Sequence, residues 1–237
     1  MIKAILFDLD GTLLPMDQDI FIKAYFSGLA KALVPLGYNQ KQLIGGIWQG
    51  TDAMIQNDGS RNNEEAFWDT FCKCVDKNAR LDEPHFDRFY RTDFQNVQQV
   101  CGFAPQAAPL VRKLRDAGLT VALATNPIFP AIATESRMRW AGFTPDDFAL
   151  YTTYENIGYC KPNPSYYVEI TKRLGVSPDE CVMVGNDVGD DMVAATLGMK
   201  VFLLTDCLIN KTNADISAYP HGGFEEAVSF FNRLLNL

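Results

Sequence analysis

The sequence predicts an α/β fold in which helices cover both faces of a parallel sheet. Four short runs, at 2–7, 119–124, 181–184 and 200–204, are apolar except for Lys3, Thr120 and Lys200 near their starts. Strands buried on both faces have this pattern, whereas half-exposed strands alternate between apolar and polar residues. Segments with helical periodicity separate the runs, which is typical of a parallel sheet. At 237 residues the chain can form one large domain or two smaller ones.

The helices expected around this sheet follow its strands in order. The first of them ends at Gly118, a residue type favoured just after a helix. We place these helices at 106–117, 130–141, 164–174, 190–197 and 223–235. In open sheets of this kind, ligands bind beyond the carboxyl ends of the strands. Polar residues that follow the apolar runs are therefore the candidates for a functional site.

The segment between the first two strands has a different pattern. Residues 17–96 contain amphipathic helical stretches rich in Phe, Trp and Tyr, without a strand-like run. We expect an inserted all-helical domain here, with the α/β core formed by 1–16 and 97–237. Large aromatic side chains are usually buried. We therefore expect the interior of the inserted domain, rather than a substrate cage, to contain Trp48, Phe67, Trp68 and Phe71.

The strongest indication of chemistry is an acid pair directly after the first strand, in Asp8-Leu9-Asp10-Gly11-Thr12. Residues two apart on a strand point to the same side, so Asp8 and Asp10 are expected to lie together. Two carboxylates this close resist joint ionisation unless a cation lies between them or one keeps a proton, and both arrangements serve catalysis. A calcium loop does not fit, because its first ligand would be Leu6. An ordinary acidic turn is the other structural explanation.

Further polar residues follow or flank other predicted strands. They are Thr125, Asn126, Lys161, Asn186, Asp187, Asp190 and Asp191. Lys161 fits less tightly than the rest, since it lies several residues beyond the short run 148–153. Each alone has a structural explanation as a turn, an exposed lysine or a helix cap. Together with the acid pair, they supply the hydroxyl, amide, lysine and carboxylate groups of a phosphate and metal site.

Each residue type has a chemical reason at such a site. A phosphate ester is anionic and repels nucleophiles, so its cleavage needs cationic clamps and an in-line attacker. Asp8 is the candidate nucleophile, because a carboxylate can form an aspartyl phosphate and divide one hard displacement into two easier ones. Asp10 is expected to protonate the leaving oxygen and then to take a proton from water. Thr125, Asn126 and the catalytic candidate Lys161 are expected to bind the phosphoryl oxygens.

Magnesium is the expected cofactor, because Mg²⁺ is bound by a few carboxylates together with waters and substrate phosphate oxygens. The expected ligands are Asp8, the main-chain carbonyl of Asp10 and a residue of the later acid cluster. Asp187 is favoured as that residue, since a hard dication gains more from a carboxylate than from an amide. Asp191, four residues on, would then share a helical face with Asp187. In the alternative register Asn186 is the ligand and Asp187 does not touch the ion.

Four motifs carry a resemblance to a known family. They are Asp8-Leu9-Asp10-Gly11-Thr12, Thr125-Asn126, Lys161 before Pro162, and Gly185-Asn186-Asp187 followed by Asp191. In this order they resemble the haloacid dehalogenase superfamily of aspartate-nucleophile phosphohydrolases, across nearly the whole chain. The acid at Asp10 resembles the phosphatase branches, because the dehalogenases lack it. One departure is Asn186, where family members commonly have an aspartate.

The resemblance also implies an architecture. It implies a Rossmann-like three-layer parallel sheet core with an inserted all-helical cap domain that covers the site. A cap that excludes water suits a hydrolysable covalent intermediate.

Composition excludes several other classes of function. A net charge of −8 and the lack of a Lys/Arg cluster disfavour nucleic acid and acidic membranes as partners. The six cysteines show neither a C-x-x-C pair nor zinc spacing, and disulfides are not expected. With no signal-peptide pattern and no apolar run near the roughly 18 residues of a membrane helix, we expect a cytoplasmic protein.

These observations predict a magnesium-dependent phosphatase that hydrolyses a small phosphorylated metabolite. One alternative is a phosphomutase, which returns the phosphoryl group to a sugar; water exclusion by the cap decides between the two. Another is a weakly active phosphate-binding regulatory protein, suggested by the shifted Asn186-Asp187 pair. Substrate identity and oligomeric state have no signal in the sequence.

Overall fold

The computed structural model describes residues 1–235. Within these residues, six strands form one parallel sheet in the order β3-β2-β1-β4-β5-β6. The strands are β1 (Ala4–Phe7), β2 (Thr120–Leu123), β3 (Leu150–Tyr151), β4 (Cys181–Gly185), β5 (Lys200–Leu204) and β6 (His221–Gly222). Because β1 lies between β2 and β4, the carboxyl ends of these neighbours flank the residues that follow β1.

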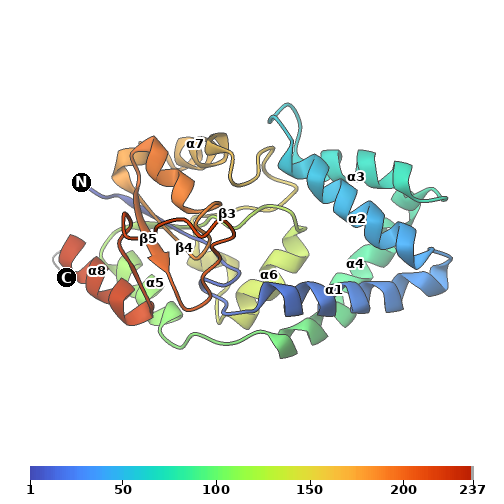
Figure 1. The fold of residues 1–237 in the computed structure, drawn as a ribbon, viewed down its shortest axis with the longest axis horizontal. Coiled ribbons are helices and arrows are strands. Elements are labelled where there is room, and N and C mark those ends of the chain that lie inside the picture. The colour runs from blue at the N-terminus through green and yellow to red at the C-terminus, as the bar shows by residue number, and fades with distance from the viewer. Residues whose placement is uncertain (236–237) are drawn as a thin grey trace.

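Alternate residues of the strands pack against helices on opposite faces of the sheet. The core helices are α5 (Ala107–Asp116), α6 (Ala131–Trp140), α7 (Pro164–Leu174), the 3₁₀ helix η6 (Met192–Leu197) and α8 (Phe224–Leu235). Ile5 and Phe7 belong to a cluster with residues of α5, α6 and α8, whereas Ala4 and Leu6 belong to a second cluster with residues of α7 and η6. The sheet is thus the middle of three layers (Figure 1), which confirms the predicted α/β fold.

Between β1 and α5, where every residue is described, the chain forms helices and turns but no strand. The helices are α1 (Gln18–Leu33), α2 (Gln40–Ile55), α3 (Asn63–Cys74), α4 (Glu83–Arg91) and the 3₁₀ helices η1 (Val34–Leu36), η2 (Ala79–Asp82) and η3 (Asp93–Val100). Figure 1 shows α1 to α4 at the right and the sheet at the left, which agrees with a helical cap beside an α/β core.

Local sequence fixes two of the cap helices. The Asp17 carboxylate accepts a hydrogen bond from the Ile20 amide at the start of α1, and Asn62 forms a capping box with Glu65 at the start of α3. Tertiary packing then holds the helices together, since Phe71 is fully buried and stacks on Phe67 with ring centroids 5.4 Å apart.

The expected burial is confirmed for three of the four aromatic residues, Phe67, Trp68 and Phe71. Phe67 and Trp68 also line the cavity of the candidate site, so interior and cavity wall are not exclusive alternatives for them. The expectation was wrong for Trp48, which is 46% exposed. Burial statistics for a residue type do not reveal on which side of a helix a cavity lies.

The chain leaves the core and returns to it at neighbouring points. Met16 and Cys101 form an isolated antiparallel bridge, and the Gly102 amide donates to the Pro15 carbonyl oxygen at 2.7 Å. The two connections between cap and core are therefore hydrogen-bonded to each other.

Two elements differ from the sequence expectation. The short strand β6 was missed, because His221 and Gly222 form no apolar run. The helix expected at 190–197 is the shorter 3₁₀ helix η6, and Asp190 and Asp191 precede it. Elsewhere the predicted core strands and helices agree with the structure to within a few residues.

Within residues 1–235, no helix combines the length and apolarity needed to cross a membrane.

Candidate active site

The site is built around the end of the central strand. Asp8 follows β1, and its amide donates to the Val184 carbonyl oxygen at 2.9 Å, which extends the pairing with β4. Gly11 then turns the chain with a φ of +82°, and a Cβ at this position would collide with the Asn186 side chain. The turn therefore requires glycine and brings Asp8, Thr12 and Asn186 together.

Lys161 joins two carboxylates at the bottom of the site. Its Nζ donates to Asp8 Oδ1 at 2.9 Å and to Asp191 Oδ1 at 2.6 Å. All three side chains are buried, so the two ion pairs act with little screening by water. The loop after β3 can place the lysine here because the Lys161 amide donates to Asn126 Oδ1 at 3.2 Å.

For each group of this triad, burial and the neighbouring charges act on the pKa in opposite directions. Burial raises the pKa of Asp8 above its usual value, although the Lys161 ammonium opposes it. Burial likewise raises the pKa of Asp191 to about 6, again against the lysine. Burial alone would lower the pKa of Lys161, but the charges of Asp191 and Asp8 outweigh it and raise the pKa. The lysine therefore keeps its proton, and a positive charge stays beside Asp8.

The second carboxylate of the acid pair has a partner that the sequence analysis missed. Asp10 Oδ2 accepts a hydrogen bond from the guanidinium of Arg137, a fully buried residue of α6. The same guanidinium donates to Thr134 Oγ1 at 3.2 Å and lies 4.3 Å from the centre of the Phe129 ring. Asp10 Oδ1 is buried and has no hydrogen-bond partner among the described residues.

The pKa of Asp10 reflects this environment. Burial raises it, and the positive charges of Arg137 and Lys161 lower it, with a net rise. A raised pKa favours the protonated form of a carboxyl group, as a proton donor requires.

A sequence signal for Arg137 existed. In the predicted helix 130–141, Ala133, Thr134, Met138 and Ala141 are spaced as one helical face. Arg137 lies on this small and apolar face, and a charged residue there calls for a buried partner.

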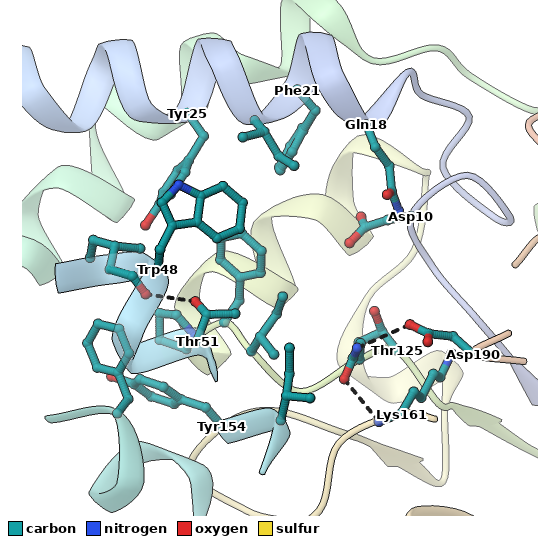
Figure 2. Close-up of a pocket in the computed structure, with 18 of the residues that line it drawn as sticks. Asp10, Gln18, Phe21, Tyr25, Trp48, Thr51, Thr125, Tyr154, Lys161 and Asp190 are labelled. Atoms are coloured by element: carbon teal, nitrogen blue, oxygen red, sulfur yellow. Dashed lines mark hydrogen bonds between the residues drawn. The ribbon is translucent and has the colours of Figure 1, made fainter. Parts of the chain in front are cut away.

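Thr125 and Asn126 follow β2 and are held by the neighbouring strand loops. The main-chain oxygen of Thr125 accepts hydrogen bonds from Thr152 Oγ1 at 2.6 Å and from the Tyr166 hydroxyl at 2.7 Å. The Asn126 amide group donates to Asp190 Oδ2 at 3.4 Å. Figure 2 shows Thr125, Lys161, Asp190 and Asp10 around one end of a cavity.

The Asn186-Asp187 pair divides into two roles. Asn186 Oδ1 accepts from Thr12 Oγ1 at 3.1 Å, and its Nδ2 donates to the Cys207 carbonyl oxygen at 2.6 Å. Asp187 Oδ1 instead accepts from the Gly189 amide at 2.7 Å and from the Asp190 amide at 3.0 Å, which closes the loop after β4. Both side chains line the cavity.

The oxygen donors of the site suit a magnesium ion that is only partly coordinated by the protein. They do not form a complete cage of protein ligands. Among residues 1–235, no group of three His, Cys, Asp or Glu side chains converges closely enough to hold a metal by itself. An ion here would depend on the Asp8 carboxylate, a main-chain carbonyl, an oxygen of Asn186 or Asp187, and water or substrate. That is the partial coordination by protein which Mg²⁺ accepts.

All the residues proposed from the sequence therefore line a single cavity. They are Asp8, Asp10, Thr125, Asn126, Lys161, Asn186, Asp187, Asp190 and Asp191. A buried carboxylate paired with a buried lysine thus lies at the end of the central strand, beside the helical insertion (Figure 1).

Comparison with known proteins gives the family. The family model for haloacid dehalogenase-like hydrolases matches residues 2–198, and the chain belongs to this family. The chain is similar to the glyceraldehyde 3-phosphate phosphatase of Methanopyrus kandleri, with 25% identity over 82% of this chain and 80% of the relative. It is 27% identical to the phosphoglycolate phosphatase of Vibrio vulnificus over 86% of this chain and 84% of that protein. The protein is thus a phosphoric monoester hydrolase.

Solved structures share its fold. The crystal structure of a HAD phosphatase from Thermococcus onnurineus has a TM-score of 0.59 and 22% identity, covering 99% of this chain and 98% of that one. The 2-haloacid dehalogenase of Pseudomonas syringae pv. Tomato has a TM-score of 0.66 and 20% identity, covering 99% of this chain and 100% of that one.

Proposed function

We propose that this protein is a Mg²⁺-dependent phosphatase that hydrolyses a small phosphomonoester metabolite in the cytoplasm, through an aspartyl-phosphate intermediate on Asp8. The observation that carries the proposal is the ion pair of 2.9 Å between Asp8 Oδ1 and Lys161 Nζ, buried beyond the central strand. This pair gives the nucleophile a fixed position and a cation beside it. Both are needed for in-line attack on an anionic phosphoryl group.

Asp8 attacks phosphorus and takes the phosphoryl group from the alcohol oxygen. Lys161 neutralises negative charge beside the reacting carboxylate, while Asp191 holds the lysine from its other side at 2.6 Å. The Thr125 hydroxyl and the Asn126 amide hold phosphoryl oxygens at the end of β2. Mg²⁺ held at this site would neutralise the negative charges of the Asp8 carboxylate and of the phosphoryl oxygens.

Asp10 donates its proton to the leaving alcohol oxygen. In the second half of the reaction it accepts a proton from the water that attacks the aspartyl phosphate, which releases inorganic phosphate and restores Asp8. Arg137 is a positioning residue in this scheme. Its guanidinium fixes Asp10 Oδ2, so that Asp10 Oδ1, which has no partner among the described residues, is the oxygen that exchanges the proton.

The proposed protein ligands of Mg²⁺ are Asp8, the main-chain carbonyl of Asp10 and Asp187. The charge of the carboxylate supports Asp187. The hydrogen bond from Thr12 to Asn186 supports the other register, because Thr12 Oγ1 also lies 3.4 Å from Asp8 Oδ2. The two registers predict different effects of Asp187→Asn and Asn186→Ala on the Mg²⁺ requirement.

The names of the two phosphatase relatives support a small substrate but disagree on its alcohol part. The alcohol part is an uncharged aldehyde in the name of the first relative and a carboxylic acid in the name of the second. We therefore propose only the class of substrate from these names, a small phosphomonoester.

A trapping experiment tests the proposal. Protein quenched with acid during turnover of a small phosphomonoester in Mg²⁺ should carry a phosphoryl group on the peptide that contains Asp8. Asp8→Asn should release no phosphate and trap no adduct. Asp116→Asn, which alters an exposed carboxylate of α5, is the matched control and should behave like the native protein. Phosphate release without an adduct on Asp8, or release that persists in Asp8→Asn, contradicts the mechanism.

A further inference from the structure

The cavity that holds the catalytic groups continues beyond them into the cap. Its volume is about 410 Å³, within the range of small-molecule sites. Figure 2 shows the polar groups at one end, while Tyr25 of α1 and Trp48 of α2 occupy the other, opposite Tyr154 of the core. When a phosphoryl group lies at Asp8, the alcohol part of the substrate has to occupy this second half.

The wall of that half is aromatic and aliphatic. Phe21, Phe26, Ile47 and Ile55 contribute to it, and the Trp48 ring packs against Phe26 with centroids 5.4 Å apart. Trp48 is nevertheless 46% exposed and Ile55 is 41% exposed. Large apolar side chains left open at a cavity gain free energy when a ligand covers them with apolar surface.

The cap half of the cavity is lined by no lysine or arginine side chain from the cap, in which every residue is described. Among the described residues that line the cavity, Lys161 and Lys211 are the only lysines or arginines, and both come from the core. The charged residue that the cap contributes is Asp87. Arg61 of the cap is paired with Asp69 and is not part of the lining. A carboxylate or second phosphate on the alcohol would lose water here without gaining an opposite charge.

The hydroxyl groups of Tyr25, Tyr90 and Thr51 in this wall already take part in hydrogen bonds, whereas the buried Trp68 Nε1 has no partner among the described residues. The Tyr25 and Tyr90 hydroxyl oxygens lie 3.0 Å apart in a shared hydrogen bond, and Thr51 Oγ1 donates to the Ile47 carbonyl oxygen at 2.9 Å. A polyhydroxylated sugar phosphate would therefore meet few free polar groups in this wall, chiefly Trp68 Nε1 and the Asp87 carboxylate. Sugar hydroxyl groups that stay unpaired weaken binding strongly in an enclosed site.

We propose that the cap half of the cavity selects a phosphomonoester whose alcohol part is uncharged and carries an aromatic ring or a comparably bulky apolar group. The inference rests on the proposed function, because it assumes that phosphorus is attacked at Asp8. It assigns the recognition of the alcohol to α1 and α2, with Trp48 as the principal contact.

Three primary alkyl phosphates test this choice, since their leaving oxygens are similar. They are 3-phenylpropyl phosphate, propyl phosphate and a propyl phosphate with a terminal carboxylate. We expect kcat/KM for the phenylpropyl ester to exceed that for propyl phosphate by about 10- to 100-fold, from burial of one ring. The carboxylated ester should fall below propyl phosphate. Equal values, or a preference for the carboxylated ester, overturn the proposal.

Variants of the wall sharpen the test. Trp48→Ala should reduce the phenylpropyl-to-propyl ratio of kcat/KM by about tenfold, and Thr51→Arg should raise the carboxylated ester relative to propyl phosphate. Leu81→Ala is the matched control, because Leu81 is a cap residue that is 75% exposed and lies outside the cavity. It should keep the native ratio. A Trp48→Ala protein with the native ratio overturns the assignment of the contact.

Binding separates this inference from the proposed function. If no ester releases phosphate, the proposed function fails, and calorimetry with 3-phenylpropylphosphonate and propylphosphonate still tests the cavity. Tighter binding of the phenyl compound, lost in Trp48→Ala, supports the inference on its own. Equal binding of the two phosphonates overturns it.

Discussion

The two ends of the cavity are built on different principles. At the core end, Asp8, Lys161 and Asp191 are buried charges held by ion pairs of 2.9 and 2.6 Å. At the cap end, aromatic side chains surround the space, and Trp48 remains half-exposed. Charged groups in fixed positions suit a reaction that always transfers the same phosphoryl group. An apolar wall on a separate insertion suits recognition of the alcohol, so the two tasks can change independently.

Removing the central cation should break the core end most severely. Lys161→Met leaves the Asp8 and Asp191 carboxylates buried without their shared cation, and we expect kcat to fall at least about 10³-fold. Steady-state phosphate release measures the effect. Lys172→Met, an exposed lysine of α7, is the control and should retain native turnover. Turnover within tenfold of the native rate in Lys161→Met would show that the lysine is not part of the reaction.

A substitution that leaves a void in the packed interior of the cap should lower stability and leave the chemical step largely unchanged. Phe71 is fully buried among Phe67, Trp68 and Phe86, so Phe71→Ala should lower the free energy of unfolding by about 3 to 5 kcal/mol. Urea denaturation measures this loss, and kcat per folded molecule should change little. A large fall in kcat without destabilisation would mean that cap packing and core chemistry are not separate.

Arg137 connects the two ends, because it pairs with Asp10 and its side chain lies over the Phe129 ring of the cavity wall. We expect Arg137→Met to lower kcat by about 10- to 100-fold, since the proton donor loses its fixed position. Arg137→Lys should recover part of this loss because it keeps a charge near Asp10. A purely structural role predicts a lower melting temperature with kcat per folded molecule unchanged in both variants.

A smaller effect, confined to the core end, should show which of Asn186 and Asp187 binds Mg²⁺. Asp187→Asn keeps the shape of the side chain and its hydrogen bonds to the Gly189 and Asp190 amides. If Asp187 is the ligand, the Mg²⁺ concentration for half-maximal activity should rise about tenfold or more. An unchanged Mg²⁺ requirement in Asp187→Asn, with a raised one in Asn186→Ala, assigns the ligand to Asn186 instead.

The acidic limb of the pH profile should also belong to the core. Burial raises the pKa of Asp8 above 3.8 and that of Asp191 to about 6. A nucleophile reacts only after losing its proton, so kcat/KM should rise with pH between about 4 and 6 as this coupled cluster ionises. A profile of native kcat/KM from pH 4 to 8 measures the limb. Activity that is flat across this range is inconsistent with the buried cluster.

The sequence predicts the core well because its signals are local. Predominantly apolar runs specify β1, β2, β4 and β5, and the polar residues after them gather at one sheet edge as the parallel arrangement requires. β6 has no such signal, since two residues paired at the sheet edge carry no pattern.

Long-range partners are what the sequence does not specify. The pairing of Asp10 with Arg137 joins residues 127 positions apart, and no periodicity encodes it beyond a charge on a buried helix face. The exposure of Trp48 depends in the same way on how α1 and α2 pack around the cavity. Both features concern the region where cap and core meet, where tertiary packing decides the environment of each side chain.

The bridge between Met16 and Cys101 has a consequence for the history of such chains. Since entry and exit of the insertion are adjacent, a genetic exchange that replaced everything between them would leave the sheet with its ends already in register. New specificities could then be acquired by recombination of whole segments, without rebuilding the machinery that breaks the ester bond.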